Sequence, residues 1–129
     1  MPVDKSMPIL VVDDYKSMVR IIRGMLSQLG FSNVDDAADG AAALEMIRAK
    51  NYGLVLSDWN MQPMTGIELA RAVRAEERTK ALPFIMITAE AKTENVVAAR
   101  QAGVNNYVIK PFTLAVLKQK ISSVIGDLG

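Results

Sequence analysis

The sequence predicts an α/β fold in which a mostly parallel sheet carries helices on both of its faces. Short apolar runs alternate with longer segments whose apolar residues recur every three or four positions, and this alternation repeats five times along the chain. Several of the short runs are apolar throughout, which suits strands buried between two layers. The length of 129 residues corresponds to one domain.

The predicted strands are short apolar or β-type runs. In chain order they span residues 9–12, 34–38, 54–57, 84–87 and 107–109, and the second has the weakest pattern. Pro83 opens the fourth strand and Thr88 closes it. Right-handed crossovers between parallel strands then restrict the topology of the sheet.

The predicted helices are segments with an apolar stripe at helical spacing. In chain order they span residues 18–29, 41–47, 67–73, 96–100 and 114–128. In the first, Met18, Ile22 and Leu26 lie on one face, and Gly30 follows as a stop signal. Gly103 ends the fourth helix in the same way, and the last helix carries its apolar stripe as far as Leu128.

The composition excludes several classes of function. Half of the residues are apolar and 22% are charged, as in ordinary globular proteins. The net charge of +1 argues against nucleic acid as a partner. With neither cysteine nor histidine, the chain cannot form disulfides, thiolate or imidazole metal sites, or a phosphohistidine of its own. We find no signal peptide and no apolar run of the roughly 20 residues that cross a membrane, so we expect a cytoplasmic protein.

Polar side chains follow four of the five predicted strands. Asp13 and Asp14 follow the first strand, Asp58 and then Asn60 the third, Thr88 the fourth and Lys110 the fifth. Open parallel sheets bind ligands beyond the carboxyl ends of their strands, where the strand order reverses. Any one of these residues alone would most often be an ordinary turn residue, but the set as a whole has a chemical logic.

Three crowded carboxylates repel one another unless a cation relieves the repulsion. All candidate ligands are oxygens, which favours a hard cation such as Mg²⁺. A lysine and a threonine hydroxyl beside such a site can hold the oxygens of a phosphoryl group. The central carboxylate can itself act as the nucleophile and form an aspartyl phosphate.

Four segments carry a resemblance to a known family. They are Leu-Val-Val-Asp-Asp at 10–14, Ser-Asp-Trp-Asn-Met at 57–61, the run 83–92 with Thr-Ala-Glu-Ala-Lys at its end, and Tyr-Val-Ile-Lys-Pro-Phe-Thr at 107–113. From about residue 8 to its end, the chain resembles the receiver domains of two-component response regulators, and among them the stand-alone chemotaxis regulators of the CheY type. The resemblance implies one receiver domain over 1–129 with a core at about 8–127. The implied fold is a flavodoxin-like, doubly wound (βα)₅ sheet of strand order 2-1-3-4-5.

The resemblance also implies the chemistry of the site. Asp58 is the expected phosphoacceptor, and a phosphohistidine of a sensor histidine kinase is its donor. Asp14 and Asp58 are expected to bind Mg²⁺ directly, together with the backbone carbonyl of Asn60, while Asp13 acts through a metal-bound water.

Three further residues are expected to read the phosphoryl group. Lys110 contacts it, Thr88 moves toward it, and Tyr107 is an aromatic switch that is buried when phosphate is present and turned outward when it is absent. The resemblance also implies a cis peptide bond before Pro111. One departure from the family pattern is that Gln62 stands where proline is usual and Pro63 follows it, so we expect the loop beside the metal site to differ in shape.

These expectations describe a monomeric signalling switch, not a turnover enzyme, and one without an output domain. Its output partner is expected to be a protein, foremost the flagellar motor switch, which would bind the surface that Thr88 and Tyr107 rearrange. An alternative is a phosphate sink, or an adaptor for a kinase or phosphorelay outside motor control. A haloacid dehalogenase-type hydrolase would need a second Asp where Asn60 stands. Flavin binding would need a Ser/Thr/Gly-rich loop after the first strand, where Asp13 and Asp14 would repel the flavin phosphate.

Overall fold

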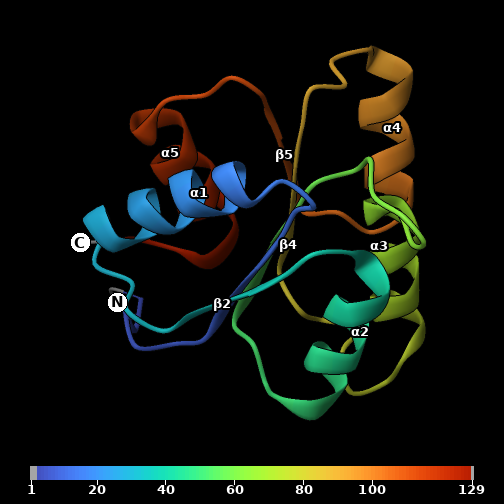
Figure 1. Ribbon diagram of the computed structural model, residues 1–129, viewed down its shortest axis with the longest axis horizontal. Coiled ribbons are helices and arrows are strands. Elements are labelled where there is room, and N and C mark those ends of the chain that lie inside the picture. Colours follow the sequence, from blue (N-terminus) through green and yellow to red (C-terminus); the bar gives the residue numbers. More distant parts are fainter. Residues whose placement is uncertain (1–2, 129) are drawn as a thin grey trace.

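Five parallel strands form one sheet in the computed structural model, which describes residues 3–128 (Figure 1). The strands are β1 (Ile9–Val12), β2 (Val34–Ala37), β3 (Leu54–Ser57), β4 (Phe84–Thr88) and β5 (Asn106–Ile109). Their order across the sheet is β2-β1-β3-β4-β5, which confirms the expected topology. The predicted domain, 1–129, includes residues 1, 2 and 129, which lie outside the described residues.

Helices cover both faces of the sheet (Figure 1). They are α1 (Lys16–Gln28), α2 (Gly40–Ala49), α3 (Gly66–Ala75), α4 (Thr93–Gln101) and α5 (Leu114–Ile125). α1 and α5 lie on one face, and α2, α3 and α4 lie on the other. Within residues 3–128, none of the helices combines the length and the apolar character that a membrane span requires.

The last helix is shorter than the sequence pattern predicts. α5 ends at Ile125 because Gly126 follows with a φ of 108°, a left-handed conformation that glycine adopts without steric cost. Leu128, predicted to be part of this helix, lies beyond it but is still buried. The apolar period therefore continued into a segment that packs on the core without being helical. The predicted stops at Gly30 and Gly103 are confirmed.

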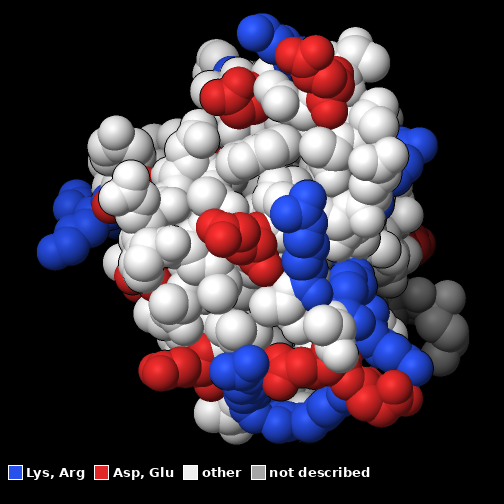
Figure 2. Space-filling view, turned by 90° about the vertical axis from the view of Figure 1, so that its right-hand side faces the viewer, with Lys and Arg blue, Asp and Glu red and all other residues white. Residues whose placement is uncertain are grey.

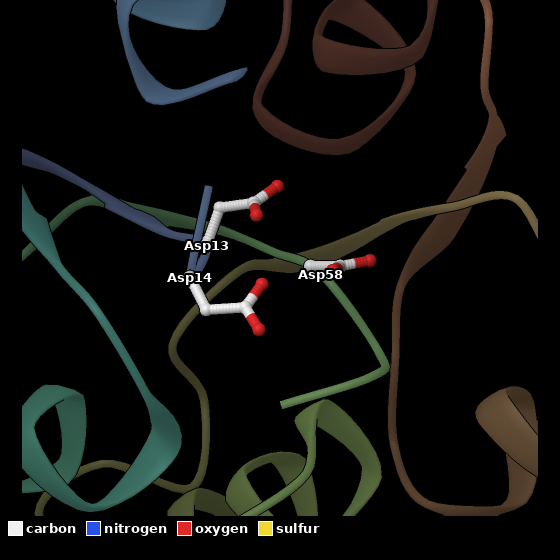
Figure 3. Close-up of side chains that lie close together, drawn as sticks. All are labelled: Asp13, Asp14 and Asp58. Carbon is white, nitrogen blue, oxygen red and sulfur yellow. The ribbon is translucent and has the colours of Figure 1, made fainter. Parts of the chain in front are cut away.

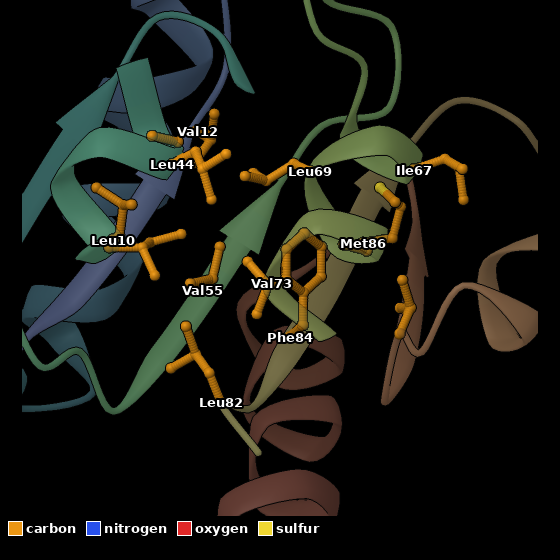
Figure 4. Close-up of a cluster of buried hydrophobic side chains, with 14 of the residues drawn as sticks. Leu10, Val12, Leu44, Val55, Ile67, Leu69, Val73, Leu82, Phe84 and Met86 are labelled. Atoms are coloured by element: carbon orange, nitrogen blue, oxygen red, sulfur yellow. The ribbon is translucent and has the colours of Figure 1, made fainter. Parts of the chain in front are cut away.

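Each central strand supplies two separate cores. In β1, Leu10 and Val12 belong to the core on the side of α2 and α3 (Figure 4), while Ile9 and Val11 belong to the core on the side of α1 and α5. All four side chains are at most 1% exposed. This two-sided burial explains why the strand is apolar at every position.

The register of the sheet brings the carboxyl ends of β1, β3, β4 and β5 to one edge. Val12 pairs with Ser57 across β1 and β3, and Thr88 pairs with Ile109 across β4 and β5. The residue that follows each strand therefore arrives at the same rim, as the sequence pattern predicts.

Candidate functional site

Three carboxylates meet at the carboxyl edge of the sheet. Asp13 and Asp14 follow β1 and Asp58 follows β3, and one carboxylate oxygen from each lies within 4.8 Å of the other two. Figure 3 shows the three carboxylates pointing to the same side. Asp13 and Asp58 are buried, whereas Asp14 is exposed. Main-chain amides hold the segments that follow β1 and β3. The amide of Tyr15 donates to Asp13 Oδ1, and the amide of Asp58 donates to the carbonyl of Val12.

Lys110 closes the site from the end of β5. Its Nζ lies 3.1 Å from Asp13 Oδ2 and 3.4 Å from Asp58 Oδ1, and its side chain is only 16% exposed. The amide of Lys110 donates to the carbonyl of Thr88, so the lysine backbone is tied to the neighbouring strand. The peptide bond between Lys110 and Pro111 is cis, as expected. Residues that are 97 positions apart in the chain therefore form one ion-pair cluster.

Burial raises the pKa of the Asp58 carboxyl above its ordinary value. The Lys110 ammonium opposes this shift of the Asp58 pKa, and the negative charge of Asp13 adds to the shift. One ammonium faces three carboxylates, so the cluster keeps an excess of negative charge that a bound cation would offset.

The donor set suits Mg²⁺. Every side-chain donor in the cluster is a carboxylate oxygen, the ligand type that hard divalent cations prefer. The exposed Asp14 and Asn60, with Met61, Gln62 and Thr65, line an adjoining cavity of about 450 Å³. This cavity leaves room for the waters that Mg²⁺ usually keeps. The Gln62–Pro63 peptide bond in its wall is cis.

Thr88 and Tyr107, the two predicted switch residues, both contact Glu90. Thr88 is fully buried, and its Oγ1 accepts a hydrogen bond from the amide of Glu90 at 3.2 Å. The Tyr107 ring is in an inward position, and its hydroxyl donates to the carbonyl of Glu90 at 2.6 Å. Burial raises the pKa of Tyr107 to about 12. The same ring forms a T-shaped pair with Trp59 at a centroid distance of 6.3 Å.

Sequence reasoning missed Glu90 as a connecting residue. Its carboxylate accepts a hydrogen bond from Asn60 Nδ2 in the loop after β3 and another from Asn95 Nδ2 in α4, both at 3.3 Å. Asn60 is therefore tied to the β4–α4 loop through its side chain, whereas the expected metal ligand is its backbone carbonyl. Glu90 lies in the Thr-Ala-Glu-Ala-Lys segment at 88–92 that carries part of the family resemblance, but that segment does not indicate which residues its carboxylate contacts, so only the fold identifies this role.

Ser57 is the second residue that sequence reasoning missed. It is fully buried at the end of β3, and its hydroxyl donates to the carbonyl of Asp58 at 2.9 Å. A polar residue at the end of an otherwise apolar buried run is the signal that could have indicated it.

Comparison with known proteins identifies the family to which this site belongs. The family model of the response regulator receiver domain matches residues 9–122. The chain belongs to this family. Receivers of this family act as signalling switches, and the acidic cluster with its lysine lies within the matched residues.

Two similar relatives are named chemotaxis proteins. The chain is 54% identical over 118 residues to the chemotaxis protein CheY of Pseudomonas aeruginosa, covering 92% of this chain and 95% of that protein. It is 48% identical over 125 residues to the chemotaxis protein CheY-3 of Vibrio cholerae, covering 97% of this chain and 96% of that protein.

Solved receiver structures superpose closely. The chemotaxis protein CheY4 of Vibrio cholerae has a TM-score of 0.85 at 31% identity, over 92% of this chain and 98% of that chain. The receiver domain of a sensor histidine kinase of Pseudomonas aeruginosa also has a TM-score of 0.85, at 32% identity, over 93% of this chain and 98% of that chain. In the latter structure a magnesium ion is coordinated in the active site cleft.

Proposed function

We propose that this receiver is a phosphorylation-dependent switch of chemotaxis signalling that accepts a phosphoryl group on Asp58 from a sensor histidine kinase. The observation that carries the proposal is the placement of Asp58, which is buried at a strand end with the Lys110 ammonium 3.4 Å from one carboxylate oxygen. A carboxylate in this setting can act as a nucleophile while the ammonium neutralises charge on the incoming phosphoryl oxygens.

The transfer exchanges one bond to phosphorus for another. An oxygen of the Asp58 carboxylate attacks the phosphorus of the kinase phosphohistidine, and the nitrogen–phosphorus bond breaks with its electron pair remaining on the imidazole. Lys110 lies where it can reach a phosphoryl oxygen, and its contact with Asp13 holds it there at 3.1 Å. The chain itself has no histidine, which agrees with a phosphodonor on another protein.

Mg²⁺ is the cofactor that we propose for this transfer. Asp14 and Asp58 would bind it directly with the backbone carbonyl of Asn60, and Asp13 would act through a water. When bound, the ion neutralises charge on the carboxylates and on the phosphoryl oxygens. The proximity of the three carboxylates at the strand ends and the place of Asp14 in the lining of the adjoining cavity support this proposal.

The switch is proposed to act through Thr88 and Tyr107. Hydrogen bonds to charged groups are typically worth ~1.5–3 kcal/mol each. Moving a two-state equilibrium from 1:99 to 99:1 requires about 5.5 kcal/mol of differential binding. Contacts of the phosphoryl group with Thr88 and with Lys110 are therefore both needed for full activation. The relatives are named chemotaxis proteins, which supports a role in chemotaxis, and we propose a flagellar motor switch protein as the foremost output partner. A cytoplasmic location stays a prediction.

The phosphoacceptor is tested with acetyl phosphate and Mg²⁺. Wild-type protein should gain one phosphoryl group by intact-mass spectrometry, and peptide mapping should place it on Asp58. Asp58→Asn should lose this adduct because an amide is a far poorer nucleophile than a carboxylate. A full adduct on that variant would place the nucleophile elsewhere.

Metal binding is tested with the fluorescence of Trp59, the single tryptophan of the chain. Because Trp59 directly follows Asp58, Mg²⁺ should change its emission in a saturable way. Asp14→Asn should weaken the response, and Glu45→Gln, which removes an exposed carboxylate on α2, should leave it unchanged. Equal titration curves for the wild type and Asp14→Asn would contradict the assigned ligands.

The output partner is tested by the affinity of the beryllofluoride-treated protein for a flagellar motor switch protein. Treatment should increase the affinity of the wild type, and Thr88→Ala should reduce this gain although it can still be phosphorylated. Lys110→Ala should lose the response while it still binds Mg²⁺. A phosphorylated wild type that shows no gain would favour a phosphate sink or a phosphorelay adaptor instead.

A further inference from the structure

Gly66 lies against the backbone of Asp58. It is the first residue of α3, it is buried, and its amide donates to the carbonyl of Trp59 at 2.9 Å. A Cβ atom at this position would come closer to the Asp58 carbonyl oxygen than non-bonded atoms can approach. It would also lie 3.1 Å from the Asp58 carbonyl carbon and 2.9 Å from Met86 Sδ. Helix α3 can therefore start at this point only because residue 66 has no side chain.

The carbonyl group of Asp58 has little freedom to move away. Its oxygen accepts a hydrogen bond from the Ser57 hydroxyl at 2.9 Å, and the Asp58 amide donates to the carbonyl of Val12 at 2.9 Å. Ser57 itself is fully buried in the sheet. A side chain at position 66 would consequently push on the Asp58 peptide group, which its hydrogen bonds with Ser57 and Val12 hold in place.

We infer that Gly66 is a positioning residue for the phosphoacceptor. Its missing side chain lets α3 fix the Asp58 peptide, and this fixes the Asp58 carboxylate at its distances from Lys110 and from the other two carboxylates. The inference rests on the proposed function of Asp58. Misplacing a reacting group by about 1 Å can cost on the order of 100-fold in rate, so a displaced Asp58 should be phosphorylated more slowly even in a fully folded protein.

Gly40 supplies a matched control. It is also the first residue of a helix, α2, and is also buried. A Cβ atom there would lie 2.8 Å from Met64 Cγ and 2.8 Å from the Met64 carbonyl oxygen, so this position is also too crowded for a side chain, although less severely than position 66. Its crowded neighbour is Met64 and not Asp58. Gly24, on the exposed side of α1, has no atom within 4 Å of such a Cβ and controls for the substitution itself.

The test compares Gly66→Ala, Gly40→Ala and Gly24→Ala. The rate of phosphorylation by acetyl phosphate is measured at saturating Mg²⁺, well below each variant's unfolding temperature and per folded molecule. Gly66→Ala should react about 10- to 100-fold more slowly than the wild type, and the ¹³C shift of the Asp58 carbonyl should change. Gly40→Ala should lose stability but react at close to the wild-type rate, and Gly24→Ala should match the wild type in rate.

Two further variants extend the test, and the first of them keeps the inference testable if Gly66→Ala does not fold. Ser57→Ala removes the hydrogen bond to the same carbonyl without adding volume, so it should also slow phosphorylation and shift the Asp58 carbonyl resonance. Gly66→Ala combined with Met86→Ala removes the contact with the sulfur atom but not the contact with Asp58, so it should not recover the rate.

The possible results separate the inference from the proposed function. A wild-type rate in folded Gly66→Ala, an equal loss in Gly40→Ala, recovery by Met86→Ala, or an unchanged rate in Ser57→Ala would overturn the positioning role. Each would leave Asp58 as the phosphoacceptor. A wild type that carries no phosphoryl group on Asp58 would instead overturn the proposed function, and the inference with it.

Discussion

Helices α3 and α4 lie on the same face of the sheet and each follows a loop of the site, yet the protein holds them in different ways. α3 buries most of one face, namely Gly66, Ile67, Leu69, Ala70 and Val73. α4, of similar length, buries only Ala99, and its Val97 is 48% exposed. Figure 2 shows the side of the molecule on which these two helices lie, with acidic and basic side chains interspersed among uncharged ones.

The first turns of the two helices differ as well. α3 begins with a capping box, in which the Thr65 hydroxyl accepts from the Glu68 amide and the Glu68 carboxylate accepts from the Thr65 amide. The N-cap residue of α4 is Lys92, whose side chain makes no capping hydrogen bond. The loop before α4 depends instead on polar contacts of Glu90 with Tyr107 and Asn95.

The far end of α4 is attached to α3. Arg74 of α3 donates from Nε to the carbonyl of Gly103 and from Nη2 to Asn105 Oδ1, both at 2.9 Å. The two helices therefore contribute differently to the proposed switch. α3 belongs to the frame that positions Asp58, while α4 is anchored at its end and weakly held at its start, where Thr88 and Tyr107 contact the loop.

The largest expected effect contrasts a core residue of α3 with an exposed residue of α4. Leu69 is fully buried, so Leu69→Ala should lower the free energy of unfolding by about 2–5 kcal/mol. Val97→Ala, on the exposed side of α4, should change it by no more than about 0.5 kcal/mol. Urea denaturation of both variants gives the comparison. Similar losses would show that α4 is packed as firmly as α3.

Removing the anchor of α4 should have the next largest effect. The Arg74 guanidinium also donates to the carbonyls of Lys80 and Leu82. Arg74→Met should lower the free energy of unfolding by about 1–3 kcal/mol, because partly buried carbonyl groups lose their donor. Amide hydrogen exchange should accelerate at the end of α4. Arg71→Met, at an exposed position of the same helix, should do neither, and equal exchange in both variants would contradict the anchor.

The capping difference predicts a pair of opposite, smaller effects. Thr65→Ala removes the capping box of α3 and should cost about 1 kcal/mol of unfolding free energy. Lys92 has the extended backbone of an N-cap, with φ −69° and ψ 141°, so Lys92→Ser should add a capping hydrogen bond and stabilise the protein by about 0.5 kcal/mol. Hydrogen exchange should slow only in the first turn of α4. A loss of stability in Lys92→Ser would show that this turn is already satisfied.

The sequence was sufficient to predict the parallel α/β fold, because apolar strands and amphipathic helices alternate along the chain, and the family resemblance added the strand order. The rim of polar residues followed from the ends of the predicted strands. Asp13, Asp58, Thr88 and Lys110 each follow or end a buried strand, so the register alone brings them together. The predicted end of the last helix, at Leu128, was wrong, because the apolar period continued past Gly126 into a buried but non-helical segment.

The supporting contacts of the site could not be predicted in the same way. Glu90 joins Asn60, Tyr107 and Asn95 through hydrogen bonds whose partners are distant in sequence and which have no periodic signature. Gly66 is informative only once the approach of its backbone to the Asp58 carbonyl is known. Such contacts depend on atomic distances between loops, and the pattern of residue types does not encode these distances.

The last expected effect concerns the hydroxyl of Tyr107, which holds the loop before α4, and it is seen at alkaline pH. Its pKa is raised to about 12 in the folded protein, against about 10 in the unfolded chain. Between these values the unfolded chain loses the phenolic proton and the folded protein keeps it. The stabilisation that the protonated Tyr107 hydroxyl gives the folded protein is therefore complete below pH 10. It is lost as the pH rises toward 12, and the free energy of unfolding falls by no more than about 1.4 kcal/mol per pH unit. Tyr107→Phe should be less stable at pH 7 by about 0.5–1.5 kcal/mol, because the hydrogen bond to Glu90 is gone, but it should lose less stability between pH 9 and pH 11.5.

Tyr52→Phe is the matched control, since Tyr52 is also buried with a raised pKa but donates to Asp35, away from α4. Both variants should show the shallower alkaline dependence, and only Tyr107→Phe should speed hydrogen exchange in the first turn of α4. Unchanged exchange there would mean that this hydroxyl does not hold the start of α4.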